Sequence, residues 1–88
     1  MDEQETLLEF PCSYSVKAMG ESGDDFDQLV FDLVALHVDN LAPDAVSSKP
    51  SSKGKYTAVT VNFTATSKAQ LDAIYYALTG HERIKIAL

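Results

Sequence analysis

The order in which two kinds of hydrophobic periodicity follow one another constrains the fold of this chain most strongly. Apolar and polar residues alternate, as in half-buried strands, over residues 13–19, 45–52, 56–65 and 83–88. Helical spacing of apolar residues fills residues 26–37 and the segment between Ser67 and Gly80. The chain therefore follows the order strand, helix, strand, strand, helix, strand.

This β-α-β-β-α-β order predicts an α+β fold, the ferredoxin-like two-layer sandwich, with an antiparallel sheet of order 4-1-3-2 and two helices on one face. The second and fourth strands become the edges, where Pro50 is tolerated because it lacks a ladder donor. With 88 residues the chain is long enough for one domain. We assign that domain to residues 10–88 and treat residues 1–9 as a loose N-terminal arm.

Local signals set the expected helix boundaries. Ser22 or Asp24 is the expected N-cap of the first helix, which should run for about four turns and include His37 in its apolar stripe. Ser67 is the expected N-cap of the second helix, and Gly80 is expected at its C-terminus.

The sheet face without helices is expected to be hydroxyl-rich and basic. Ile84, Ile86 and Leu88 are expected to face the core. RNA-binding modules of this topology stack bases on aromatic side chains of the first and third strands. Here the stacking positions hold Ser, Lys, Ala, Thr and Asn, so RNA recognition is not favoured. Strand alternation assigns to this face Ser13, Ser15, Lys17, Thr60, Asn62, Thr64, Arg83 and Lys85.

The net charge of −6 is unevenly distributed along the chain. Eleven of the thirteen acidic residues lie in residues 1–44, and six of the seven cationic residues lie in residues 45–88. An acidic total argues against nonspecific binding to nucleic acids or anionic membranes. The acidic N-terminus lacks the features of a secretion signal, no apolar run is long enough to span a bilayer, and there is one cysteine, so we expect a cytoplasmic protein.

Catalytic and metal-binding patterns are not recognisable in the sequence. Cys12 has no CxxC partner, and His37 and His81 lie far from it along the chain. The carboxylates of Asp24, Asp25 and Asp27 are expected at the start of a helix, where they interact with its dipole, and are not an acid–base pair. We therefore expect neither an enzyme nor a bound metal or cofactor.

The densest candidate site is the segment 47–56, where three lysines fall within seven residues beside four serines and a glycine. Ammonium groups, hydroxyls and turn amides are the donors that bind carboxylates and phosphates. The alternative is a solubilising hairpin whose lysines discourage edge-to-edge aggregation. The candidate binding residues are Lys17, Lys49, Ser51, Ser52, Lys53, Gly54, Lys55, Tyr56 and Lys85.

Three segments resemble the YbeD-like family of small bacterial proteins of unknown function. They are Leu8-Glu9-Phe10-Pro11, Lys17-Ala18-Met19-Gly20 (close to the family's K-V-M-G) and Lys49-Pro50-Ser51-Ser52-Lys53-Gly54-Lys55-Tyr56. The resemblance implies a ferredoxin-like sandwich, a likeness to ACT-type domains that bind small effectors, and a regulatory link to lipoate known from genome context alone. It implies no catalytic residue.

Two functions follow as expectations. The first is a non-catalytic regulatory or binding module that takes a small anionic metabolite, or an acidic protein surface, at the basic hairpin. The alternative is a protein–protein interaction adaptor acting through sheet edges or the open sheet face. Pairing of sheet edges would also allow a homodimer.

Overall fold

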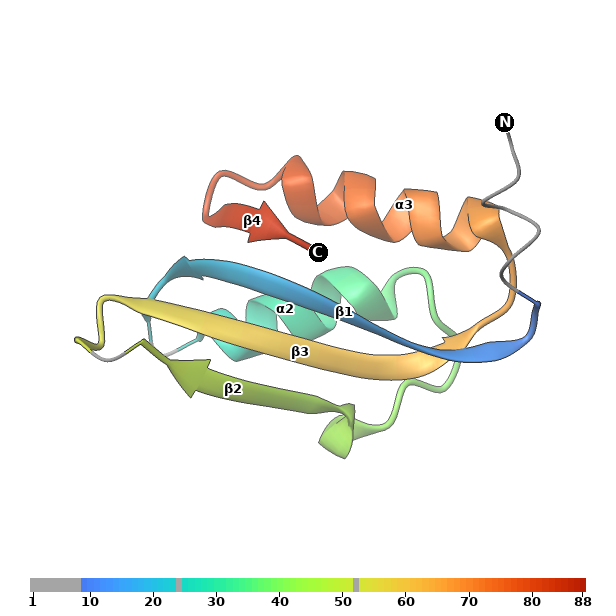
Figure 1. Ribbon diagram of the computed structural model, residues 1–88, viewed down its shortest axis with the longest axis horizontal. Coiled ribbons are helices and arrows are strands. Elements are labelled where there is room, and N and C mark those ends of the chain that lie inside the picture. The colour runs from blue at the N-terminus through green and yellow to red at the C-terminus, as the bar shows by residue number, and fades with distance from the viewer. Residues whose placement is uncertain (1–8, 24, 52) are drawn as a thin grey trace.

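The computed structural model describes residues 9–23, 25–51 and 53–88. Figure 1 shows the elements in chain order, and their bounds are β1 (Cys12–Glu21), α2 (Phe26–Ala35), a short 3₁₀ turn (Pro43–Ala45), β2 (Val46–Pro50), β3 (Tyr56–Ala65), α3 (Lys68–Thr79) and β4 (Ile84–Ala87). The β-α-β-β-α-β order is the predicted one.

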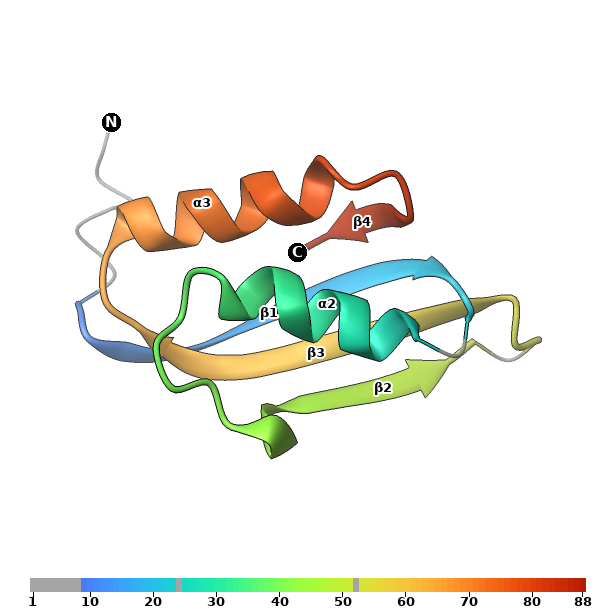
Figure 2. The same cartoon turned by 180° about the vertical axis from the view of Figure 1, so that it is seen from behind.

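The strands form one sheet in the order β2-β3-β1-β4, in which every neighbouring pair is antiparallel. This is the predicted order 4-1-3-2 read from the other edge. Both helices lie on one side of the sheet, as Figure 2 shows from behind. The predicted α+β ferredoxin-like sandwich is therefore confirmed, and Pro50 lies on the edge strand β2, as expected.

The core fills the space between the sheet and the two helices. Helix α2 contributes Phe26, Val30 and Val34, and α3 contributes Leu71, Ile74 and Leu78. The sheet contributes Val16, Ala18, Val59, Val61, Phe63, Ala65 and Ile84. Burial of these apolar side chains, at roughly 25 cal/mol per Å², provides the main stabilisation of the fold. Neither α2 nor α3 has the length and apolar character of a helix that crosses a membrane.

The bounds of β3 and α3 agree with those predicted, whereas those of the other elements differ by a few residues. Strand β3 covers the predicted 56–65, and Ser67 caps α3 by accepting a hydrogen bond from the Gln70 backbone N–H at 3.0 Å. Strand β1 is longer than expected, because Gly20 continues the strand instead of ending it. Strand β2 is shorter than the predicted 45–52, and Ser52 lies outside the described residues.

The first helix is shorter than its apolar spacing indicated. It ends at Ala35, so His37 lies in the turn that follows, where its backbone N–H bonds to the Val34 carbonyl. The expected cap at Ser22 is wrong, because the Ser22 hydroxyl bonds to Thr57 Oγ1 at 2.6 Å and Asp25 occupies the N-cap position. The alternative cap, Asp24, lies outside the described residues.

A bulge in β4 overturns the expected facing of the C-terminal residues. Gly20 pairs with Ile84, but Met19 pairs with Ile86, which leaves Lys85 as an extra residue between the pairs. Ile86 therefore faces the same side as Met19, away from the helices, and is 49% exposed. Leu88, two residues further on, faces the same side as Ile86. The prediction that Ile86 and Leu88 face the core is therefore wrong.

Arg83 also departs from its expected place on the open face. Its guanidinium contacts the Asp25 carboxylate at 3.1 Å, at the start of α2. The same group lies 5.7 Å from the centroid of the buried Phe26 ring. Arg83 thus joins β4 to α2 on the helical side of the sheet.

Candidate functional site

The surface of the sheet that α2 and α3 leave uncovered is the main candidate site, and we call it the open face. The strand registers determine which side chains point to it. They are Ser13, Ser15, Lys17, Met19, Glu21, Ser47, Lys49, Tyr56, Ala58, Thr60, Asn62, Thr64, Ile86 and Leu88.

Two lysines and two hydroxyls gather near the centre of the open face. Ser47, Thr60 and Lys17 lie side by side on β2, β3 and β1, and Lys49 lies two residues along from Ser47. Because neighbouring strands are about 4.8 Å apart, Lys17 and Lys49 come from strands about 10 Å apart, within joint reach of one ligand. The two predicted residues Lys17 and Lys49 therefore belong to one surface.

An apolar patch adjoins these lysines. The register places Lys49, Ala58, Met19 and Ile86 in one row across the four strands. Leu88 lies next to Lys17, since the Leu88 N–H donates to the Lys17 carbonyl at 2.8 Å and the Leu88 carbonyl accepts from the Lys17 N–H at 2.9 Å. Leu88 is 69% exposed. The open face is thus both basic and apolar.

The basic hairpin lies at the end of this sheet, between β2 and β3. Gly54 has a φ of 74°, the left-handed region that glycine tolerates best, and its N–H bonds to the Ser51 carbonyl at 2.9 Å. Ser51 Oγ accepts a long bond of 3.3 Å from the Tyr56 N–H. The Lys55 ammonium lies 5.5 Å from the Tyr56 ring centroid. Ser51, Lys53, Gly54, Lys55 and Tyr56 are all exposed.

Hydrogen bonds connect the hairpin to β1. The Ser22 N–H donates to the Lys55 carbonyl at 2.9 Å, and Glu21 pairs with Tyr56 across the ladder. The Gly54 amide is bonded within the turn, and the exposed ammonium groups of Lys53 and Lys55 are donors that the hairpin offers to an anion. Ser52, the remaining predicted hairpin residue, lies outside the described residues.

Lys85 is not brought together with the hairpin lysines. It occupies the bulge on the edge strand β4, three strands from Lys49 and therefore about 14 Å away across the sheet. It lines a hollow of about 350 Å³ that it shares with Glu21 and Glu82. Arg83 also lines this hollow. Lys85 therefore has two carboxylates and a second cation near it, and it lies apart from Lys49.

The acidic residues are segregated from the open face. Among its side chains only that of Glu21 is acidic. The helices and their connections carry exposed Asp25, Asp27, Asp32, Asp39, Asp44, Asp72 and Glu82. Among residues 9–23, 25–51 and 53–88, the acidic side chains therefore lie mainly on the helical side, whereas two lysines lie on the open face.

One tyrosine has a perturbed environment away from the open face. The Tyr75 and Tyr14 hydroxyls lie 3.3 Å apart between α3 and β1. Burial raises the pKa of the Tyr75 phenol above its ordinary value, and the hydrogen bond to Tyr14 raises it further. A phenol with a raised pKa is a weaker acid and keeps its proton at neutral pH. Tyr76, its neighbour, is 80% exposed, as expected of adjacent helical residues.

Within residues 9–23, 25–51 and 53–88, no three His, Cys, Asp or Glu side chains gather as metal ligands would. Cys12 is a free, half-buried thiol at the start of β1.

The sequence pattern did not predict the apolar part of the open face. Residues 84–88 alternate regularly, and a regular strand would place Ile84, Ile86 and Leu88 on one face. The bulge at Lys85 reverses the last two. A usable signal was Ala87, a small apolar residue able to fill the inward position that the shift opens opposite Ala18.

Comparisons with known proteins agree with the fold and with the sequence motifs. Residues 5–88 match the model of a family described as "Protein of unknown function (DUF493)". A UPF0250 protein of Chromobacterium violaceum is 45% identical over 87 residues, covering 99% of this chain and 98% of that protein. UPF0250 protein NMA1380 of Neisseria meningitidis serogroup A is 43% identical over 83 residues, covering 94% of this chain and 91% of that protein.

A solved structure shows the same fold at low sequence identity. The solution structure of protein HP0495 from Helicobacter pylori superimposes with a TM-score of 0.71 at 11% identity, covering 99% of this chain and 91% of that one. At this identity the likeness concerns the fold alone. The family match and the curated relatives together show that this chain belongs to the DUF493 family of proteins of unknown function, the YbeD-like proteins that its motifs resemble.

Proposed function

We propose that this protein is a non-catalytic binding module that recognises an acidic protein segment on its open face. The observation that supports this most is the segregation of charge, because Lys17 and Lys49 share a face on which Glu21 is the one acidic side chain. Complementary charge increases the association rate and selects against wrong partners. The partner is expected in the cytoplasm.

The apolar patch supports a protein partner. Met19, Ile86 and Leu88 lie beside the lysines, and Ile86 and Leu88 are exposed. Protein–protein interfaces commonly combine apolar side chains with charged ones, as this face does. A small metabolite on such a surface would remain largely in water. An acidic segment with apolar residues could bury the patch and contact both lysines at once.

A titration with an acidic peptide tests this function. The probe is acetyl-EDLLED-amide, added to ¹⁵N-labelled protein while amide signals are followed by NMR. We expect shifts at residues 17–19, 47–49 and 58–60 and near the C-terminus, weakening as salt screens the charges. Shifts confined to α2 and α3, or none at millimolar peptide, would contradict the proposal.

The exposed hairpin supports a second candidate, the binding of a small anionic metabolite by Lys53 and Lys55. In its favour, the Lys55 ammonium lies beside the Tyr56 ring in an exposed position, so a ligand could contact the charge and the ring together. A thermal-shift screen of carboxylates and phosphates, repeated on Lys53→Ala and Lys55→Ala, tests it. A stabilising anion whose effect disappears in these variants would support the candidate, and the absence of any shift would exclude it.

A further inference from the structure

The outer edge of β2 offers unpaired backbone groups. Strand β2 is at the end of the sheet order, and the Ser51 N–H donates inward to the Tyr56 carbonyl at 2.7 Å. Because the direction of backbone groups alternates along an antiparallel strand, those of Val46, Ser48 and Pro50 point to the outer edge. Within the described residues no backbone partner satisfies them.

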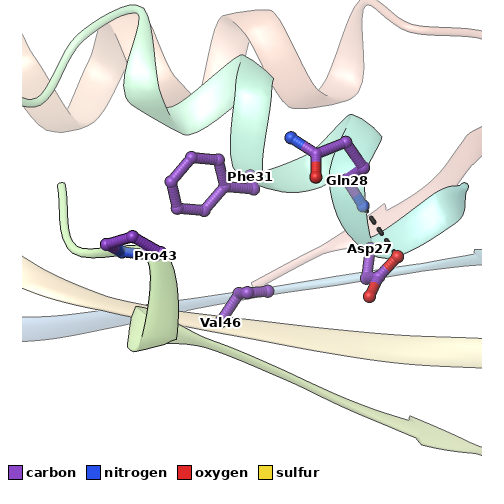
Figure 3. A pocket seen from close by; sticks show the side chains of 5 residues that line it. All are labelled: Asp27, Gln28, Phe31, Pro43 and Val46. Atoms are coloured by element: carbon purple, nitrogen blue, oxygen red, sulfur yellow. Dashed lines mark hydrogen bonds between the residues drawn. The ribbon is translucent and has the colours of Figure 1, made fainter.

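A groove lies directly beside this edge, on the helical side of the sheet. Figure 3 shows Phe31 of α2, Pro43 of the 3₁₀ turn and Val46 of β2 around it, with Asp27 and Gln28 at the other end. Val46 faces this side because it pairs with the buried Val61. The groove therefore joins the strand edge to the first helix.

The size of the groove favours a single side chain as its occupant. Its volume is about 210 Å³. Sites for cofactors and drug-sized ligands are larger, usually above about 300 Å³. A strand added to the edge of β2 would place every second side chain on the helical side, next to Val46 and Ser48. One such side chain, if apolar, would enter between Phe31 and Pro43.

The charge around the groove determines the flanking residues of that occupant. Asp27 lines it, and Asp44 follows Pro43 directly in sequence. Gln28 Nε2 donates to Asp32 Oδ1 at 2.8 Å, which holds a third carboxylate on the same side of α2. The described ion pairs involve other acids, Asp25 and Asp72. The rim therefore favours lysine or arginine on both sides of an apolar anchor.

We propose that β2 and this groove bind an extended basic peptide segment of a partner protein, which adds a strand to the sheet and inserts one apolar side chain between Phe31, Pro43 and Val46. This surface is separate from the open face and has the opposite charge. The proposal does not depend on the proposed function, and a basic probe distinguishes the two.

The test uses the peptide acetyl-KTLTK-amide, whose leucine and lysines share one face of a strand. We expect amide shifts at residues 46–49, in the first two turns of α2 and at the 3₁₀ turn. The peptides acetyl-ETLTE-amide and acetyl-KTSTK-amide should bind at least about fivefold more weakly, because they lack the charge or the anchor. Equal shifts from all three peptides, or no shifts at millimolar concentration, would overturn the proposal.

Variants test the two components separately. Asp27→Asn with Asp44→Asn should weaken KTLTK binding about fivefold, whereas Asp39→Asn with Asp72→Asn makes the same charge change elsewhere and should not. Ser48→Pro removes the outward N–H and should weaken binding, whereas Ser48→Ala retains it. Thermal unfolding verifies that each variant is folded. Equal affinity in all variants, or edge signals that depend on protein concentration without peptide and so report pairing with a second copy, would overturn the proposal.

Discussion

Ile86 lies opposite Met19 on the open face, although regular alternation of β4 would bury it. The bulge at Lys85 is responsible, and the same shift places Leu88 beside Lys17. We expect Ile86→Ser to leave the free energy of unfolding within about 0.5 kcal/mol of wild type, since the side chain is half exposed. Ile84→Ser, at a buried position of the same strand, should cost several times more. Urea unfolding of both variants compares them; equal losses would contradict the assigned facing.

Gly20 allows a close approach between β1 and β4. A β-carbon here would collide with the Arg83 carbonyl oxygen and lie 2.8 Å from the Phe26 ring. Gly20→Ala should therefore destabilise the protein by about 2 kcal/mol through overpacking. Gly54→Asn is the control, because that site is open and asparagine tolerates a positive φ. If the two variants unfold at the same urea concentration, the close approach is not important for stability.

Ser67 is the side chain that caps α3. Replacing it with alanine leaves the Gln70 N–H without its acceptor and should cost about 1 kcal/mol, whereas Ser67→Asp retains an acceptor and should cost less. Thermal unfolding followed by circular dichroism measures both. A Ser67→Ala variant as stable as wild type would contradict this role.

The raised pKa of Tyr75 predicts a decline of stability at high pH. The unfolded chain loses phenolic protons near pH 10, whereas folded Tyr75 keeps its proton beyond that point. Above about pH 10 the native state therefore binds more protons than the unfolded state, and stability falls as pH rises. Urea unfolding between pH 8 and about 11 should show this fall in wild type and in Tyr76→Phe, and a smaller one in Tyr75→Phe. An equal fall in all three would exclude Tyr75 as the cause.

Sequence periodicity was sufficient to predict the architecture, because the burial of one face of each element requires a periodic pattern of apolar residues. The alternation at residues 56–65 matches β3 without error, and the Ser67 cap, the order of the strands and the edge position of Pro50 all agree with the structure. Each of these depends on interactions within one element or on the pairing that one buried face requires.

Tertiary contacts determine the features that hydrophobic periodicity did not predict. The bulge at Lys85 and the contact of Arg83 with Asp25 join residues distant along the chain, and neither leaves a periodic signal. For the candidate site, the sequence predicted the basic residues but not the apolar patch beside Lys17. The sequence also did not indicate that Lys85 shares a hollow with Glu21 and lies at a distance from the hairpin lysines.

We propose above that the open face is the binding surface. The affinity of an acidic peptide for charge-reversed variants is a direct test of this proposal. Fluorescence anisotropy of labelled acetyl-EDLLED-amide would be measured with wild type, with Lys17→Glu plus Lys49→Glu, and with Lys68→Glu, which reverses a charge on α3. We expect a loss of affinity of about tenfold or more for the double variant and little change for Lys68→Glu. Equal affinities for all three proteins would contradict the proposal.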